Sequence, residues 1–205
     1  MSSRSSSVTP DQIKVLRERT GAGIMECKKA LEKTDGQMEE AIKLLQAQGA
    51  DIAREKAGRE TKQGLVGSYV HGGKIGVLVE VNCETDFVAR TDQFKNLIHE
   101  VCLQVASMKP RYVSREEVAH EEIAATLAQL HEELGGIDEE ATQPIQQSHM
   151  ENFYKEQVLL DQPYIKDSSK RIQDLLNETV ASLRENVVIR RFVRISLGES
   201  IPSSS

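Results

Sequence analysis

A run of alternating residues between Val77 and Val81 places the strongest constraint on the fold of this 205-residue chain. Every second residue in the run is valine, which is the period of a β-strand with one buried face. A second run of strand-forming residues covers Leu65–His71, and Gly72-Gly73 is a favoured turn between two paired strands. The sequence therefore predicts an antiparallel hairpin whose second strand covers Lys74–Cys83.

Four residues that follow this strand are predicted to form a surface turn: Thr85, Asp86, Phe87 and Val88. Thr85 suits the N-cap of a following helix, because its side-chain oxygen can accept a free backbone N–H. Asp86 would then face the positive end of the helix dipole. Phe87 leaves two alternatives open: it packs in the protein's own core, or it is exposed and inserts into a partner.

Three short amphipathic helices are predicted ahead of the hairpin. The first begins at Thr9-Pro10, where a threonine N-cap precedes a proline in the first helical position. The second follows the break at Thr20–Gly23, and the third ends at Gly49. Three helices of this length bury only a marginal core, and such modules usually bind partners rather than catalyse reactions.

The rest of the chain adds helices and strands around the hairpin. Apolar spacing predicts a helix from Phe94 to Val105, and Ser114 opens a capping box before an acidic helix that stops at Gly135-Gly136. Four further elements are predicted: a helix over Glu139–Gln157, a short edge strand over Val158–Ile165, a helix around Ile172–Leu183 and a final strand over Val187–Leu197. The predicted fold class is α+β, with a three-helix module followed by a core in which helices flank a small antiparallel sheet.

The charge-rich stretch between the module and the hairpin lacks a strong apolar stripe, which is typical of a linker. We therefore expect five segments: a disordered tail over 1–8, the module over 9–50, the linker over 51–63, the core over 64–199 and a second tail over 200–205.

Charge and hydropathy exclude several classes of function. The net charge of −6 comes from one acidic region, since Ser114–Glu151 holds ten acidic residues against Arg115 alone. No dense cluster of Lys and Arg is present for binding a phosphate backbone, so direct nucleic-acid binding is not expected. The chain has no apolar run near the roughly 18 residues of a membrane span, and Met1–Ser7 does not resemble a secretory signal. We expect a cytosolic protein that binds no membrane.

The chemistry-bearing residues do not form a recognisable catalytic or metal site. Cys27, Cys83 and Cys102 are widely spaced, which argues against a disulfide framework or a zinc site. Gly73-Lys74 fails as a phosphate loop, because Ser68 replaces its first glycine. No nucleophile lies in a recognisable pattern with a base, and no cofactor is expected. A hydrolase or transferase site built from distant residues, and a purely structural adaptor, remain alternatives.

Four runs of sequence carry a resemblance to a known family. They are T-G-A-G-I-M-E-C-K-K-A-L (Thr20–Leu31), the linker run A-R-E-K-A-G-R, the hairpin and turn over Ser68–Arg90, and R-F-V-R-I-S-L-G-E (Arg191–Glu199). Together they resemble bacterial or organellar elongation factor Ts, and the similarity extends from Thr9 to Glu199. The resemblance implies a guanine-nucleotide exchange factor that binds elongation factor Tu in its GDP-bound and nucleotide-free forms, without covalent chemistry of its own.

The resemblance also implies roles for particular residues. Thr85, Asp86, Phe87 and Val88 would dislocate Mg²⁺ from elongation factor Tu. The three-helix module, ubiquitin-associated-like in this family, would contact the GTPase through Arg17, Ile24 and Met25, and the hairpin residue His71 would also contact the partner.

The length of the chain places it among the short members of the family. It has room for one core repeat, and the resemblance implies that the helical hairpin inserted in long members is absent. Short members tend to act as dimers, so a homodimer is expected through the sheet or the neighbouring helices. The lack of a presequence favours a bacterial cytoplasm over an organelle.

Overall fold

The computed structural model describes residues 8–135 and 139–199. The chain divides into two compact units, each assembled from three separate segments. The first contains Met1–Leu65, Val81–Leu97 and Gln173–Val188, and the second contains Val66–Glu80, Ile98–Ile172 and Ile189–Ser205. Helices accompany a small antiparallel sheet, so the predicted α+β class is confirmed. The domain limits predicted from the sequence stay a prediction.

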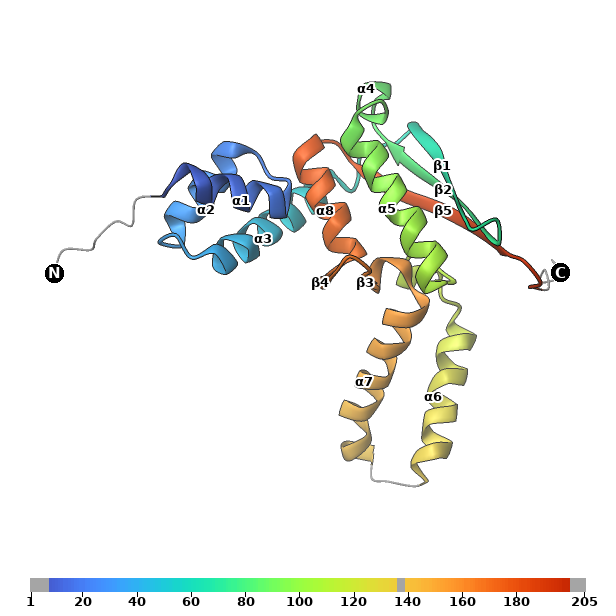
Figure 1. The fold of residues 1–205 in the computed structure, drawn as a ribbon. Helices are drawn as coiled ribbons and strands as arrows, with labels where there is room; N and C mark the ends of the chain where they lie inside the picture. The colour runs from blue at the N-terminus through green and yellow to red at the C-terminus, as the bar shows by residue number, and fades with distance from the viewer. Residues whose placement is uncertain (1–7, 136–138, 200–205) are drawn as a thin grey trace. The chain divides into compact units, whose positions relative to one another are not determined.

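Three helices open the first unit (Figure 1). They are α1 (Pro10–Thr20), α2 (Ile24–Lys33) and α3 (Met38–Lys56). Thr9 caps α1 as predicted, because its backbone N–H donates to the Gln12 side chain at 2.9 Å and its hydroxyl accepts the Gln12 N–H. Leu16 and Leu31 are fully buried in the small apolar core that the three helices share.

Helix α3 continues past Gly49, where the sequence predicted its end. Gly49 is buried, and a Cβ atom placed on it would lie 3.6 Å from the carbonyl oxygen of Asn177 and 3.8 Å from the Cβ atom of Ala181. Both neighbours belong to helix α8 (Ile172–Leu183). A methyl group would fit at this contact at ordinary van der Waals distance, although glycine weakens a helix interior by about 1 kcal/mol. The glycine therefore marks a helix contact and not a helix end.

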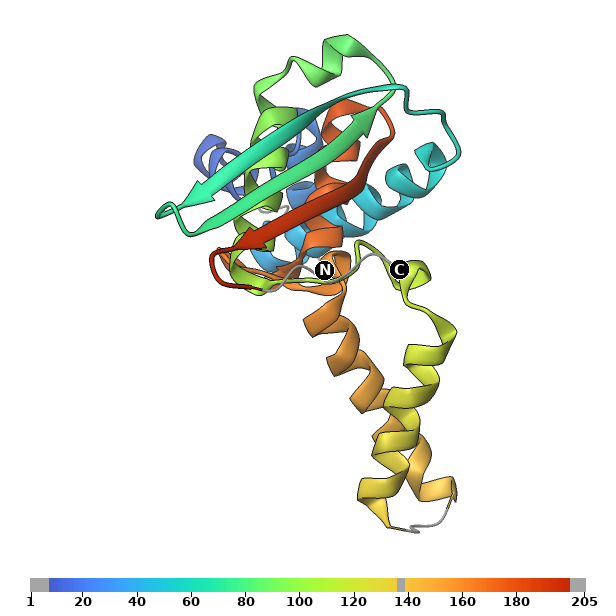
Figure 2. The ribbon, with the colours of Figure 1, turned by 90° about the vertical axis from the view of Figure 1, so that its right-hand side faces the viewer.

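The sheet has three strands in the order β1-β2-β5, and Figure 2 looks onto it. The strands are β1 (Gln63–His71), β2 (Ile75–Cys83) and β5 (Val187–Ser196). The predicted hairpin turn is confirmed: Gly72 and Gly73 have φ values of 55° and 67°, and Lys74 donates its N–H to the His71 carbonyl at 2.9 Å. Positive φ at both central residues is typical of a type I′ turn.

Helix α5 (Asp92–Met108) lies behind the sheet in Figure 2. Val77 and Val79 are buried, whereas the intervening Leu78 is half exposed, so β2 alternates as predicted. Gly67 makes the closest approach, because a Cβ atom there would lie 2.0 Å from Cγ2 of Ile98 on α5. Only glycine allows β1 and α5 to pack at this distance.

Helices α6 (His120–Leu134) and α7 (Glu139–Gln157) lie side by side as a helical hairpin (Figures 1 and 2). Their pairing is marked by a contact of 2.6 Å between Nε2 of Gln146 and Nε2 of His131. Helices were predicted in both of these regions of the sequence, and the implied absence of the insertion found in long members stays a prediction. Gly135 ends α6 in the left-handed conformation, as predicted, and Gly136 lies outside the described residues.

The acidic helix does not begin at the predicted capping box. Ser114 precedes only a 3-10 turn, η1 (Arg115–Glu117), and α6 starts at His120. The glutamate expected to complete the box is used elsewhere, because Glu117 accepts the N–H of Val113 at 2.8 Å. Arg115 reaches Asp161 at 2.6 Å and Glu151 at 3.0 Å and lies over the ring of Tyr154. These ion pairs tie the base of the hairpin together.

The edge strand predicted over Val158–Ile165 is largely replaced by other structure. A 3-10 turn, η2 (Leu159–Asp161), precedes the two-residue strand β3 (Pro163–Tyr164), which pairs antiparallel with β4 (Asp167–Arg171). The buried Gln162 side chain accepts from Gln104 at 3.1 Å and donates to the Glu156 carbonyl at 2.9 Å. The backbone turns here because these buried amides are satisfied by each other and by the main chain.

Candidate functional site

The predicted turn after β2 forms the short helix α4 (Asp86–Ala89), with Thr85 as its N-cap. The Thr85 hydroxyl accepts the N–H of Val88 at 3.4 Å, as the sequence predicted. Below it, the thiol of Cys83 donates to the Thr85 carbonyl at 3.1 Å. Burial raises the pKa of Cys83 to about 11, so this thiol stays protonated near neutral pH and keeps its donor. The turn is therefore anchored from beneath.

Phe87 projects from this turn with 80% of its surface exposed. The alternative in which Phe87 packs in the protein's own core is therefore wrong. The next phenylalanine along the chain, Phe94 on α5, is fully buried. A large aromatic side chain in water gains nothing for the fold, so its apolar surface is available to a partner.

Asp86 lies in the first turn of α4, where its charge meets the positive end of the helix. Its carboxylate also accepts from the Arg90 guanidinium at 2.7 Å. Both side chains are at least half exposed, so the pair adds little to stability. Asp86 therefore presents an accessible carboxylate beside the aromatic ring of Phe87.

A second acid, Glu185, also bonds to the turn. Glu185, which comes after α8, accepts the Thr85 N–H at 3.0 Å and the Thr85 hydroxyl at 2.6 Å. Its neighbour Asn186 donates its backbone N–H to Glu84 at 2.6 Å and its side-chain amide to the Arg59 carbonyl at 2.8 Å. The turn thus rests on residues about 100 positions further along the chain.

The two most exposed large apolar side chains described in the three-helix module lie in the first turn of α2. Ile24 is 56% exposed and Met25 is 60% exposed. Both residues follow the break at Thr20–Gly23 that the sequence predicted. Arg17 is also exposed, on α1, and its carbonyl accepts the N–H of Gly21, which has the left-handed φ of 67°. Ile24, Met25 and the Thr85–Val88 turn lie in the same compact unit.

His71 belongs to the other compact unit, at the end of β1. It is exposed, and its Nδ1 atom lies 2.9 Å from the hydroxyl of Tyr69. The Tyr69 ring also meets His99 edge-on, with the ring centroids 6.1 Å apart. The two histidines and the tyrosine make a small aromatic patch. Of these three residues, the sequence analysis singled out only His71.

The described residues contain neither a group of metal-ligating side chains nor a membrane-spanning helix. Within residues 8–135 and 139–199, no group of three or more His, Cys, Asp or Glu side chains could hold a metal ion. Over the same ranges, no helix is long and apolar enough to cross a bilayer. The three cysteines are all buried and unpaired with one another. The candidate site is a set of exposed apolar and charged side chains.

Sequence reasoning missed the residues that support the turn. The sequence analysis did not single out Arg184, Glu185 or Asn186. Their partners lie far away in the chain, so neither periodicity nor local spacing could indicate them. A short acidic-polar stretch between a helix and a buried strand is the only local signal.

Comparison with known proteins identifies relatives along nearly the whole chain. The sequence profile of the family described as "Elongation factor TS" matches residues 14–199. The Elongation factor Ts of Thermoanaerobacter sp. is 51% identical over 203 residues, covering 97% of this chain and 98% of the relative. The protein of that name from Coprothermobacter proteolyticus is 51% identical over 195 residues, covering 94% and 99%. That from Thermotoga neapolitana is 47% identical over 193 residues, covering 94% and 98%.

Proposed function

Because the chain belongs to the elongation factor Ts family of translation elongation factors, we propose that it is the guanine-nucleotide exchange factor for elongation factor Tu. It binds the GDP-bound GTPase, dislocates the Mg²⁺ ion and promotes GDP release, so that GTP can bind. The observation that carries this proposal is the exposed Phe87 on an anchored turn, with Asp86 beside it. No covalent step is assigned to the chain, and it needs no cofactor.

The chemistry of Mg²⁺ explains why a small wedge is sufficient. Mg²⁺ demands near-ideal octahedral oxygen geometry and bridges the phosphate oxygens of a bound nucleotide. A slight displacement of the loops around the ion therefore removes much of the affinity for GDP. Burying Phe87 in the partner would contribute about 2–3 kcal/mol toward that displacement. Thr85 and Val88 fix the direction in which the ring enters, and Asp86 places a negative charge near the metal.

The three-helix module supplies the docking surface in this proposal. Ile24 and Met25 are exposed and adjacent, and burying two such side chains contributes a comparable amount to association. Arg17 adds a positive charge on the same module. His71 contacts the partner from the hairpin. Docking therefore contributes affinity, and the turn contributes the distortion.

Thermodynamic linkage makes the coupling between factor binding and nucleotide binding reciprocal. If the factor weakens nucleotide binding by some ratio, the nucleotide weakens factor binding by the same ratio. Arrival of GTP at the empty GTPase therefore ejects the factor, which is not consumed. The partners are elongation factor Tu in its GDP-bound and nucleotide-free forms, without direct nucleic-acid or membrane contact. Since the relatives are bacterial, we place this activity in a bacterial cytoplasm.

A homodimer is part of the proposal. Five apolar side chains are at least half exposed on the sheet: Val66, Val70, Leu78, Val193 and Ile195. They alternate with less exposed residues along their strands, so they gather on one face. An apolar face of this kind suits a second copy of the chain. Light scattering at micromolar concentration is expected to give twice the mass of one chain, and Leu78→Arg is expected to give a monomer.

The decisive experiment loads elongation factor Tu with a fluorescent GDP analogue and follows its release after mixing. We expect catalytic amounts of this protein to accelerate release in the presence of excess GTP. An adaptor would bind the GTPase without accelerating release. A hydrolase or transferase would do neither, so unchanged release kinetics would overturn the proposal.

A further inference from the structure

Three consecutive residues immediately after α8 bond to three other segments of the first compact unit: the start of α2, the end of α3 and the Glu84-Thr85 pair. Arg184, in the left-handed conformation with φ of 60°, donates its guanidinium to the carboxylate of Glu26 on α2. Glu185 holds Thr85, and Asn186 holds Glu84 and the end of α3 through the Ala57 and Arg59 carbonyls. We call Arg184–Asn186 the junction.

The junction bonds to both of the elements that the proposed function uses. Glu26 comes directly after Ile24 and Met25, and its carboxylate also accepts the N–H of Gly23 at 3.1 Å, which fixes the start of α2. Thr85 is the N-cap of the helix that carries Phe87. One short segment therefore contacts the base of the exposed apolar pair and the base of the exposed ring.

Glu185 orders the turn in a way that its own helix cannot. A helix of four residues has too few hydrogen bonds to persist alone. The Thr85 hydroxyl has one proton, and donating it to Glu185 at 2.6 Å leaves the oxygen lone pairs free for the Val88 N–H. The second carboxylate oxygen takes the Thr85 N–H. Charge-assisted hydrogen bonds of this kind are about twice as strong as neutral ones.

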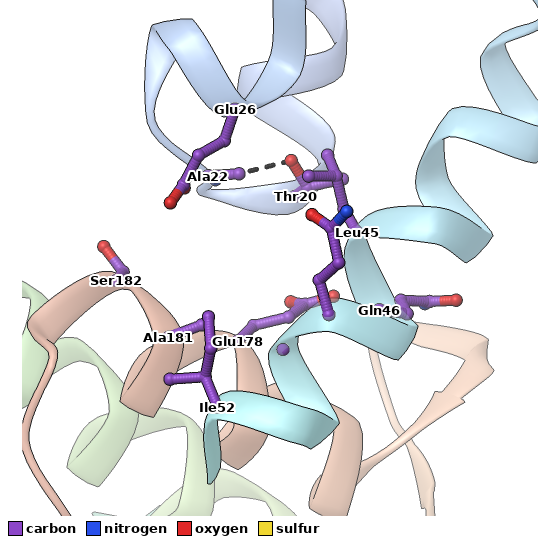
Figure 3. A pocket seen from close by; sticks show the side chains of 11 residues that line it. Thr20, Ala22, Glu26, Leu45, Gln46, Ile52, Glu178, Ala181 and Ser182 are labelled. Carbon is purple, nitrogen blue, oxygen red and sulfur yellow. Dashed lines mark hydrogen bonds between the residues drawn. The ribbon is translucent and has the colours of Figure 1, made fainter. Parts of the chain in front are cut away.

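The three-helix module is seated closely on α8 just ahead of the junction. Gly49 of α3 meets Asn177 and Ala181. Figure 3 shows a cavity of about 30 Å³ beside this contact, which Glu26, Ile52 and Ser182 also line. The module and α8 therefore contact each other directly, with a cavity beside the contact.

We propose that Glu185 and Arg184 are positioning residues, which hold the Phe87 turn and the Ile24-Met25 surface in one fixed arrangement so that both meet the GTPase at once. This inference rests on the proposed exchange function. When two binding elements are held rigidly together, binding of the first places the second at a high effective concentration near its own site on the partner. Preorganisation also removes the entropic cost of ordering the two elements during binding. Glu185 orders the turn, and Arg184 links the module to it.

The first test separates the turn from the fold. Glu185→Ala is expected to lower the rate of GDP release at saturating factor on the order of tenfold, as one or two ordering hydrogen bonds are lost. Glu185→Gln keeps an acceptor for the Thr85 N–H and is expected to lose less. Glu151→Ala, which removes a carboxylate from an arginine pair elsewhere, is the matched control and is expected to leave the rate unchanged.

A double-mutant cycle distinguishes positioning from general stability. If Glu185 acts through the turn, Glu185→Ala is expected to cause no further loss in a Phe87→Ala background. Fully additive losses would overturn the inference. If Phe87→Ala itself leaves the rate unchanged, the wedge of the proposed function fails instead. If Phe87→Ala lowers the rate and neither Glu185 variant does, only the positioning role fails.

Arg184 is tested by a different kinetic parameter. Arg184→Ala is expected to raise the factor concentration needed for the half-maximal rate by a few-fold, while the maximal rate is unchanged. This split is expected because the module supplies affinity and the turn supplies the distortion. An Arg184→Ala variant with both parameters as in the unmodified protein would remove Arg184 from the proposal. Amide hydrogen exchange at Thr85, faster in Glu185→Ala than in Arg184→Ala, provides a readout independent of the GTPase.

Discussion

Helices α4 and α5 are neighbours in the chain and start in the same way, yet their phenylalanines have opposite environments. Each helix is preceded by a threonine whose hydroxyl accepts a backbone N–H: that of Val88 for Thr85 and that of Phe94 for Thr91. Phe87 is 80% exposed, whereas Phe94 is fully buried. Capping chemistry therefore sets where each helix begins and does not decide what its first turn buries.

The difference comes from the length of helix beyond the first turn. Helix α5 has 17 residues and buries an apolar face that includes Leu97, Ile98 and Val101. Helix α4 has four residues and buries only Ala89. A single turn cannot cover an aromatic ring, so the ring stays in water unless another molecule covers it. Of these two rings, the fold therefore depends on Phe94, and Phe87 is left exposed.

The largest effect expected from this comparison is on stability. Phe94→Ala is expected to lower the free energy of unfolding by about 3–5 kcal/mol, because it removes a fully buried ring and leaves a cavity. Phe87→Ala is expected to change it by less than about 0.5 kcal/mol, as for most exposed positions. Urea denaturation of both variants measures the two values. Similar losses in the two variants would abolish the distinction between the helices.

The next largest effect is expected on nucleotide exchange, where Phe87 is the phenylalanine that matters. Phe87→Ala is expected to lower the rate of GDP release by about 30- to 100-fold, which corresponds to the roughly 2–3 kcal/mol from burying the ring in the partner. Release of fluorescent GDP, normalised to the folded fraction, measures it. Val88→Ala, with its side chain partly buried on the same turn, serves as a comparison. Undiminished release by Phe87→Ala would return the turn to a purely structural role.

Local patterns in the sequence predicted the elements that depend on local chemistry. The valine alternation predicted β2, Gly72-Gly73 predicted the hairpin turn, and Thr85 was predicted as an N-cap. In each case the deciding interaction joins residues a few positions apart. The environment of Phe87 was left open, because spacing alone does not show how much apolar surface its helix can cover.

The predictions that were wrong depend on partners distant in the chain. Gly49 was predicted to end α3, but the helix continues to Lys56, and the glycine lies against α8. Ser114 has the pattern of a capping box, but Arg115 is held by Asp161 and Glu151 instead. The contact of Glu185 with Thr85 joins positions 100 residues apart. Such interactions leave no periodic signal in a single sequence.

The two capping threonines sharpen the comparison further. Thr91→Ala is expected to lower the free energy of unfolding by about 1 kcal/mol, the usual effect of removing an N-cap, without changing exchange per folded molecule. Thr85→Ala is expected to have a similar effect on stability and, in addition, to slow GDP release several-fold, because it removes one of the two hydrogen bonds that Thr85 makes to Glu185. Thermal denaturation and GDP release on the same samples measure both. Equal exchange by the two variants would show that the cap of α4 does not matter to the partner.

The smallest effect is expected from the charge beside the ring. Asp86→Asn keeps a residue that suits the first turn of a helix, and it weakens only an exposed pair with Arg90 worth less than about 1 kcal/mol. Stability is therefore expected to be unchanged, while GDP release slows about two- to fivefold because a negative charge near the metal is lost, equivalent to roughly 0.4–1 kcal/mol.

Since the metal and the wedge compete for one arrangement of the nucleotide site, raising the Mg²⁺ concentration is expected to oppose the unmodified protein more than Phe87→Ala. A titration of Mg²⁺ against the release rate tests this order, with Asp86→Asn falling between the other two. Equal sensitivity to Mg²⁺ in all three proteins would show that the turn acts elsewhere than at the metal.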